Sequence, residues 1–117
     1  MKRPITVSIV GILFIIIGIL SLSKAIWPLL GGNAARITGH ELMDSGIVFV
    51  SAVVALVGGL FVLRGANWAR WLCLLWMAFH VVVSLFHNTT ELLVHVLWML
   101  VLIVLLTFGK AAAYFRA

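Results

Sequence analysis

The chain is poor in charged residues, and above all in acidic ones. Only 9% of its 117 residues are charged, and three of them are Asp or Glu. A soluble domain carries about a quarter charged residues, so this chain cannot build a surface that faces water. A single cysteine, Cys73, also excludes an internal disulfide, and we interpret it as a small buried hydrophobe rather than a redox group.

Long apolar runs take up most of the sequence. The segments 5–23, 45–63, 71–86 and 92–109 contain no Lys, Arg, Asp or Glu. A helix of about 19 residues is roughly 28 Å long, which is close to the hydrocarbon thickness of a bilayer. The sequence therefore predicts an all-α membrane protein, a single four-helix transmembrane domain over residues 1–117. The predicted spans are about 5–27, 45–63, 68–87 and 91–109.

The basic residues are sorted to one side of these spans, and their positions predict the topology. Six of the eight bases precede the first span, separate the second from the third, or follow the fourth: Lys2, Arg3, Arg64, Arg70, Lys110 and Arg116. The acidic residues all fall in the other two connectors. Because bases accumulate on the cytoplasmic side, both termini are predicted to be cytoplasmic in a bacterial inner membrane. The net charge of +5 is therefore interpreted as a topology signal, and nucleic acid is not an expected partner.

The start of the chain resembles a secretory signal peptide, with two bases before an apolar stretch. The apolar run exceeds the usual length of about 7–15 residues, so we favour an uncleaved first span.

The first connector, residues 24–44, is too long for a simple turn. Pro28 is expected to end or bend the first helix. Gly31 to Asn33 should break the chain, and Asn33 could cap a short helix through Met43. We expect that helix to lie at the membrane interface, over the outer end of the bundle.

Small residues mark the helix contacts. Gly11 and Gly18 lie seven residues apart in the first span, and Ser51, Ala55 and Gly59 follow one another at intervals of four in the second. Stripes of small residues let helices approach closely in lipid. We therefore expect the tightest helix contact between the first two spans.

A stripe of polar residues crosses the last two spans. His80, Ser84 and His87 share one face of the third span, while Glu91 and His95 share a face of the fourth. A tight hairpin at residues 88–90 makes these faces neighbours. His80 and His95 are thus expected to share one site, because ionisable groups inside a bilayer usually face the bundle interior.

The polar stripe permits several chemistries and specifies none. His80 and His95, with Ser84 and Trp98 beside them, could hold a haem or chlorin, or hydrogen-bond a quinone. The imidazoles could equally bond only to neighbouring helices.

The outer rim of the stripe offers a metal-binding alternative. His87, Glu91 and His95 are candidate ligands for a divalent metal ion. The competing interpretation is that Glu91 closes a capping box with Asn88 at the start of the fourth span.

One stretch of the chain resembles a known group of proteins. The residues concerned are Arg64–Trp71, Trp76–Val81, Ser84, His87, Glu91, Leu92 and His95. Their pattern is similar to that of small bacterial inner-membrane proteins with four spans and no known function. The resemblance covers spans two to four. It implies a bacterial source and a four-helix architecture, but no activity.

Three functions are compatible with the sequence. The first is a non-enzymatic accessory or assembly subunit of a larger membrane complex or a homo-oligomer, because the connectors leave no room for a soluble catalytic site. The second is a redox or pigment protein that binds haem, pigment, metal or quinone through His80 and His95. The third, a dimeric small-solute transporter, is disfavoured because no carboxylate lies deep in a span to couple protons.

Overall fold

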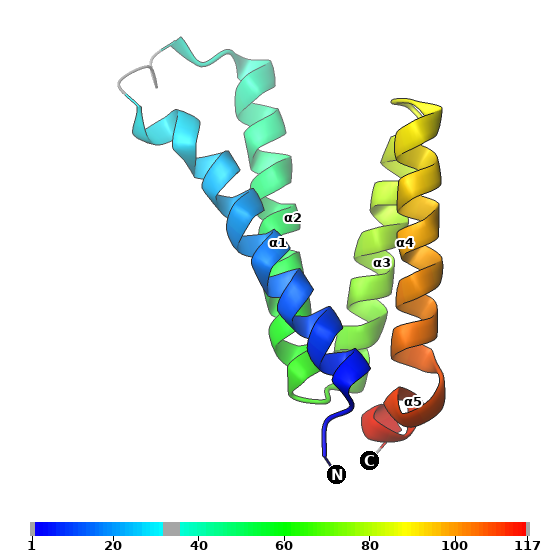
Figure 1. Ribbon diagram of the computed structural model, residues 1–117. Helices are drawn as coiled ribbons and strands as arrows, with labels where there is room; N and C mark the ends of the chain where they lie inside the picture. Colours follow the sequence, from blue (N-terminus) through cyan, green and yellow to red (C-terminus); the bar gives the residue numbers. More distant parts are fainter. Residues whose placement is uncertain (1, 32–35, 117) are drawn as a thin grey trace.

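The computed structural model describes residues 2–31 and 36–116, and within these ranges it contains five helices and no strand (Figure 1). The helices are α1 (Ile5–Leu30), α2 (Gly39–Leu63), α3 (Asn67–Ser84), α4 (Thr89–Thr107) and α5 (Gly109–Arg116). The predicted all-α class is confirmed. Helices α1, α2 and α4 are long and apolar enough to cross a membrane. Helix α3 is 18 residues long and less apolar, because it carries Arg70 and His80.

The helices form two antiparallel pairs, α1 with α2 and α3 with α4 (Figure 1). The pairs meet near the end that holds both termini, α5 and the α2–α3 connection, which we call the terminal end. They diverge toward the end that holds the α1–α2 connector and the α3–α4 turn, which we call the open end. The molecule is therefore V-shaped, with its tightest packing at the terminal end.

Helices α1 and α2 make the most extensive contact between two helices. A Cβ atom on Gly18 would lie 2.6 Å from Leu56 Cγ, and one on Gly59 would lie 2.8 Å from the backbone oxygen of Gly11. Such distances are far shorter than van der Waals contact, so the glycines let the two backbones touch. The expectation that the first two spans carry the tightest contact is confirmed within this chain.

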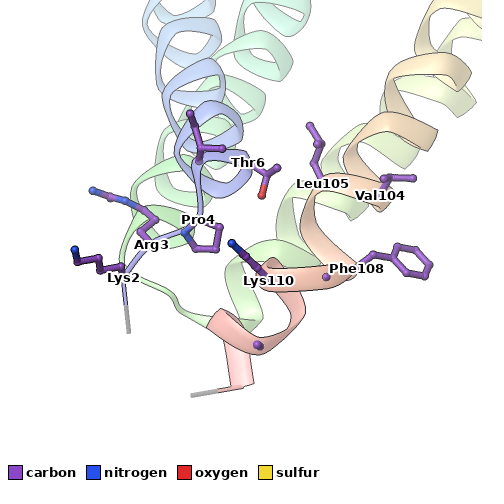
Figure 2. A pocket seen from close by; sticks show the side chains of 11 residues that line it. Lys2, Arg3, Pro4, Thr6, Val104, Leu105, Phe108 and Lys110 are labelled. Carbon is purple, nitrogen blue, oxygen red and sulfur yellow. The ribbon is translucent and has the colours of Figure 1, made fainter.

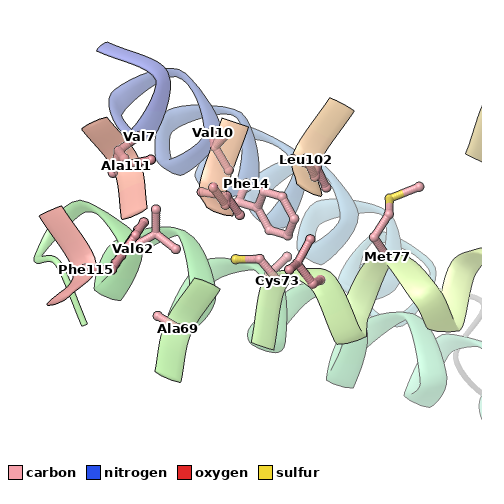
Figure 3. Close-up of a cluster of buried hydrophobic side chains, with 13 residues drawn as sticks. Val7, Val10, Phe14, Val62, Ala69, Cys73, Met77, Leu102, Ala111 and Phe115 are labelled. Atoms are coloured by element: carbon pink, nitrogen blue, oxygen red, sulfur yellow. The ribbon is translucent and has the colours of Figure 1, made fainter. Parts of the chain in front are cut away.

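A cluster of buried side chains from all five helices fills the terminal half of the molecule (Figure 3). Val7, Val10, Val62 and Leu106 are at its centre and fully buried, and Cys73 is only 1% exposed. The thiol is free and behaves as the small buried hydrophobe that the sequence indicated.

The first connector differs from its prediction. Helix α1 continues through Pro28 to Leu30. The cap of α2 is Thr38, whose hydroxyl accepts from the Glu41 N–H at 3.2 Å, while the Glu41 carboxylate accepts from the Thr38 N–H at 2.8 Å. Because this capping box starts α2 at Gly39, residues 39–43 are its first turns rather than a separate interfacial helix. The expected cap, Asn33, lies outside the described residues.

The third span is shorter than expected, the fourth begins and ends two residues earlier, and a fifth helix follows them. Helix α3 ends at Ser84 and not at residue 87, because residues 85–87 tighten into i→i+3 turns. Helix α4 ends at Thr107, and Gly109 adopts a positive φ of 62° that redirects the chain. Helix α5 then packs Ala111 and Phe115 into the core.

Two side chains tie the terminal end together through one atom. The backbone oxygen of Leu63, at the end of α2, accepts hydrogen bonds from Arg3 Nη1 and from Tyr114 Oη, both at 3.0 Å. The last carbonyls of a helix have no partner within the helix. The N-terminal segment and α5 therefore supply the partners that the end of α2 lacks.

Candidate functional site

His80 is the centre of the polar stripe and lies half-buried on α3. Its Nδ1 atom is 2.9 Å from the backbone oxygen of Trp76, one turn earlier, and the two rings lie 3.9 Å apart between centroids. A carbonyl only accepts, so this contact requires the hydrogen on Nδ1. In a neutral imidazole the lone pair is then on Nε2, where it is available to a ligand.

His95 faces His80 from α4, with the two ring centroids 6.0 Å apart. Ser84 links them: its hydroxyl donates to the His80 backbone oxygen at 2.7 Å and lies 2.5 Å from His95 Nδ1. A hydroxyl has one hydrogen, so His95 Nδ1 must donate to Ser84 Oγ. Both imidazoles of the pair thus carry their hydrogen on Nδ1 and keep a free lone pair on Nε2.

His87 and Glu91 form a separate pair in the exposed α3–α4 turn. His87 Nδ1 lies 3.0 Å from a Glu91 carboxylate oxygen. Asn88 caps α4 by accepting from the Glu91 N–H at 2.8 Å. This is one half of the predicted capping box, because the Glu91 carboxylate accepts from His87 rather than from the Asn88 N–H. His95 is not part of this pair, because its Nδ1 atom contacts the Ser84 hydroxyl instead. Across residues 2–31 and 36–116, no three His, Cys, Asp or Glu are arranged to hold a metal ion, so the structure does not gather the expected metal trio.

Trp98 follows His95 by one turn of α4 but does not share the ring contacts of the histidine pair. Its side chain is 48% exposed, and in the described parts of the chain no aromatic contact joins it to His80 or His95. Of the four residues that the sequence proposed for a cofactor, the structure brings together His80, Ser84 and His95.

A cavity of about 490 Å³ between α1, α2 and α3 reaches His80. Its polar lining consists of Ser21, Lys24, Asp44, Ser45, Ser51 and His80, while Phe79 and Val83 add apolar wall. Lys24 and Asp44 lie toward the open end of α1 and α2. The sequence did not reveal this cavity, because Ser51 belongs to a stripe of small residues that indicated helix packing.

Trp76 extends the polar stripe to α2. Its indole N–H is 3.0 Å from the backbone oxygen of Ser51 and 2.9 Å from the Ser51 hydroxyl. The ring also packs edge-on against Phe14 at 5.2 Å between centroids. A chain of polar contacts therefore runs from Ser51 through Trp76, His80 and Ser84 to His95, and it connects three helices.

Arg70 is a buried cation, although the sequence indicated only a topology marker. It is 6% exposed, and its Nη1 lies 3.4 Å from the backbone oxygen of Leu106. The guanidinium carbon lies 4.8 Å from the Trp71 ring centroid and 5.4 Å from that of Phe115. This cation thus joins α3, α4 and α5 at the terminal end.

The histidine pair has the chemistry of a ligand-binding site. Two neutral imidazoles with free Nε2 atoms can accept hydrogen bonds from a hydroxylated headgroup or donate lone pairs to a metal centre.

Comparisons of the chain with protein-family models, with curated proteins and with solved structures gave no match.

Proposed function

We propose that this chain is a multi-pass protein of the bacterial inner membrane and a non-enzymatic subunit of a larger membrane assembly. The observation that carries the proposal is an apolar groove of about 1000 Å³ between α2 and α3. Its lining residues lie between Met43 and Val54 in α2 and between Leu72 and Val82 in α3. These two helices diverge toward the open end (Figure 1). A complete four-helix bundle would close this space with its own side chains.

The path of the chain supports four crossings. Helices α2 and α4 both run from the open end to the terminal end (Figure 1). If both cross the bilayer, α3 must return the chain across it. Its most polar residue, Arg70, lies near the terminal end and is covered by α5, which lowers the cost of a crossing by this helix.

The bases support a cytoplasmic terminal end. Lys2, Arg3, Arg64, Lys110 and Arg116 all belong to segments at this end. The acidic residues lie in the first turns of α2 and α4, at the open end. The positive-inside rule therefore places both termini in the cytoplasm.

The groove has the composition of an unfilled helix contact. Gly46 and Ala78 offer small surfaces in it, and Val50 and Leu75 supply apolar walls. A Cβ on Gly46 would have no atom within 4 Å, unlike those on Gly18 and Gly59. Small residues let a further helix approach closely, so we infer that a transmembrane helix of another subunit or of a second copy occupies the groove.

Photocrosslinking in native membranes tests this inference, with a photoreactive residue introduced at one position of the chain at a time. At Val50 or Leu75 we expect it to crosslink to another protein and give a discrete adduct of defined mass. Leu97 and Ile19, which are 62% and 53% exposed away from the groove, are the controls. They should give lipid adducts only. Lipid adducts alone at all four positions would contradict the proposal.

A second function is favoured by the cavity at His80. We propose that it binds the hydroxylated headgroup of a small amphiphile such as a quinol, whose O–H donates to His80 Nε2. His95, with its ring centroid 6.0 Å from that of His80, is a second acceptor behind it. Absorption spectra and solvent extracts of the natively purified protein should reveal a bound chromophore. His80→Ala should lose it, whereas His40→Ala should not, because His40 is exposed and does not line the cavity. Identical extracts from all variants would exclude this function.

A further inference from the structure

A second cavity, of about 820 Å³, lies at the terminal end between the N-terminal segment, the start of α1, the end of α4 and the start of α5 (Figure 2). Three cationic residues line it: Lys2, Arg3 and Lys110. The acidic residues of the chain all lie in the first turns of α2 and α4. The cavity thus has an unbalanced positive charge that neither the histidine pair nor the α2–α3 groove involves.

The three cations differ in how they can reach a ligand. Lys110 projects from α5 into the space beside Pro4 and Thr6 (Figure 2). Arg3 is held by its hydrogen bond to the Leu63 oxygen, so it contributes its charge from a fixed place. Lys2 is exposed and its long stem can turn toward the cavity. The first turn of α5 has no acidic residue, so the positive end of its dipole adds to the field.

The other wall of the cavity is apolar and belongs to a membrane-crossing candidate. Val104, Leu105 and Phe108 come from the last turn of α4 and its cap. Val104 is 58% exposed and Phe108 is 64% exposed. Cations at the membrane surface next to apolar side chains at acyl-chain depth fit a ligand with an anionic head and a hydrocarbon tail.

We infer that this cavity binds an anionic phospholipid of the leaflet at the terminal end. Its phosphate lies between Lys110 and Lys2, and an acyl chain lies against Val104 and Phe108. Basic pockets at the ends of membrane helices recognise anionic headgroups in this way. Free phosphate would leave the apolar wall uncovered, and a partner helix would have to bury the lysines. The inference is independent of what occupies the α2–α3 groove.

Lipid retention by the full chain tests the inference. Protein reconstituted with equal amounts of phosphatidylglycerol and phosphatidylcholine of the same acyl chains is delipidated stepwise, and native mass spectrometry counts the bound lipids. The wild type should retain phosphatidylglycerol selectively. Each lysine near an anionic lipid contributes roughly fivefold, so Lys2→Ala with Lys110→Ala should lower that selectivity by about thirtyfold. Lys110→Gln alone should lower it by about fivefold.

The matched control is Arg64→Ala with Arg116→Ala, which removes two exposed charges from the same end but none from the cavity. This variant should retain phosphatidylglycerol like the wild type. An equal loss in the control would mean a diffuse surface field and would overturn the inference. Displacement of the lipid by millimolar inorganic phosphate would assign the site to free phosphate, and equal retention of both lipids would exclude any anion preference. Matching unfolding temperatures establish that all variants are folded.

Discussion

Ser84 shows how one small side chain can join two helices. It is 2% exposed, and its single hydrogen goes to the His80 backbone oxygen while its oxygen accepts from His95. The hydroxyl thereby fixes the tautomer of His95 and places the ring beside His80. A serine at an apolar depth is inexpensive only when its oxygen and hydrogen both have partners. Here both partners lie within the chain.

Replacing Ser84 by Ala should weaken the α3–α4 hairpin. We expect a loss of about 1 kcal/mol in the free energy of unfolding, because interhelical hydrogen bonds in membranes are worth that order. Titration with a denaturing detergent measures it. Ser23→Ala is the control, since the Ser23 hydroxyl donates to the Ile19 oxygen of its own helix at 2.9 Å, and within the described residues it has no bond to another helix. Equal effects of the two substitutions would show that the bond to His95 adds nothing.

Arg70 is the other residue whose surroundings decide its role. Lysine keeps the charge but lacks a planar guanidinium that can stack on Trp71 and Phe115. We therefore expect Arg70→Lys to lower the free energy of unfolding by about 1 to 2 kcal/mol. Arg64→Lys should change it little, because Arg64 is exposed although it lies 5.3 Å from the Phe61 ring. Thermal unfolding in detergent compares the two variants. Equal melting temperatures would show that the Arg70 guanidinium does not stabilise the contact between α3, α4 and α5.

At the scale of elements, α2 contains glycines in two opposite situations. A Cβ on Gly59 would lie 2.8 Å from the Gly11 oxygen and 2.9 Å from Phe14 Cβ, whereas one on Gly46 would meet nothing within 4 Å. Gly59→Ala should therefore destabilise the α1–α2 pair by about 1 to 3 kcal/mol, as overpacking does. Gly46→Ala should leave the isolated chain unchanged or stabilise it by up to about 1 kcal/mol.

Detergent-induced unfolding of both variants tests this pair of expectations. In native membranes, Gly46→Ala should lower stability instead if a partner helix fills the groove, because the new methyl group would then contact that helix. A stable Gly59→Ala variant would mean that α1 and α2 can separate without loss.

Periodicity predicted the elements better than it predicted their ends. The polar stripe predicted that His80 and His95 lie on facing sides of α3 and α4, because a tight hairpin permits few other arrangements. The extension of α2 to Gly39 depends on the Thr38–Glu41 capping box. Its Thr-x-x-Glu pattern is visible in the sequence, but the Gly31–Asn33 segment before it predicts an earlier helix start. Helix α5 was missed because eight mostly small or polar residues after a long span give no apolar stripe of useful length.

The candidate site was predictable only where it depends on one hairpin. Trp76 and Ser51 come from helices whose relative rotation no local pattern specifies, so their hydrogen bond could not be anticipated. The basic cavity lies at the terminal end, where the two helix pairs meet, and the cavity at His80 depends on the angle at which the pairs diverge. That angle depends on packing of Gly58 against Cys73 and of Phe61 against Trp68. Sequence periodicity carries no information about it.

At the scale of the whole molecule, the arrangement predicts which residues meet each side of the membrane. Both termini and α5 lie at one end, and the α1–α2 connector and the α3–α4 turn lie at the other (Figure 1). The native Cys73 is 1% exposed, so the wild type should be silent toward a membrane-impermeant maleimide. Single cysteines introduced at exposed positions can therefore show on which side of the membrane each position lies, because the native cysteine does not react.

In intact spheroplasts, we expect Arg36→Cys and Thr89→Cys to react with the maleimide, because both positions are exposed at the open end. Lys2→Cys and Lys110→Cys should react only after permeabilisation, since the topology proposed from the bases around them puts the terminal end in the cytoplasm. The reverse pattern would invert the proposed orientation and move the anionic-lipid cavity to the outer leaflet. Reaction of Thr89→Cys together with Lys110→Cys from one side would mean that α4 does not cross the bilayer.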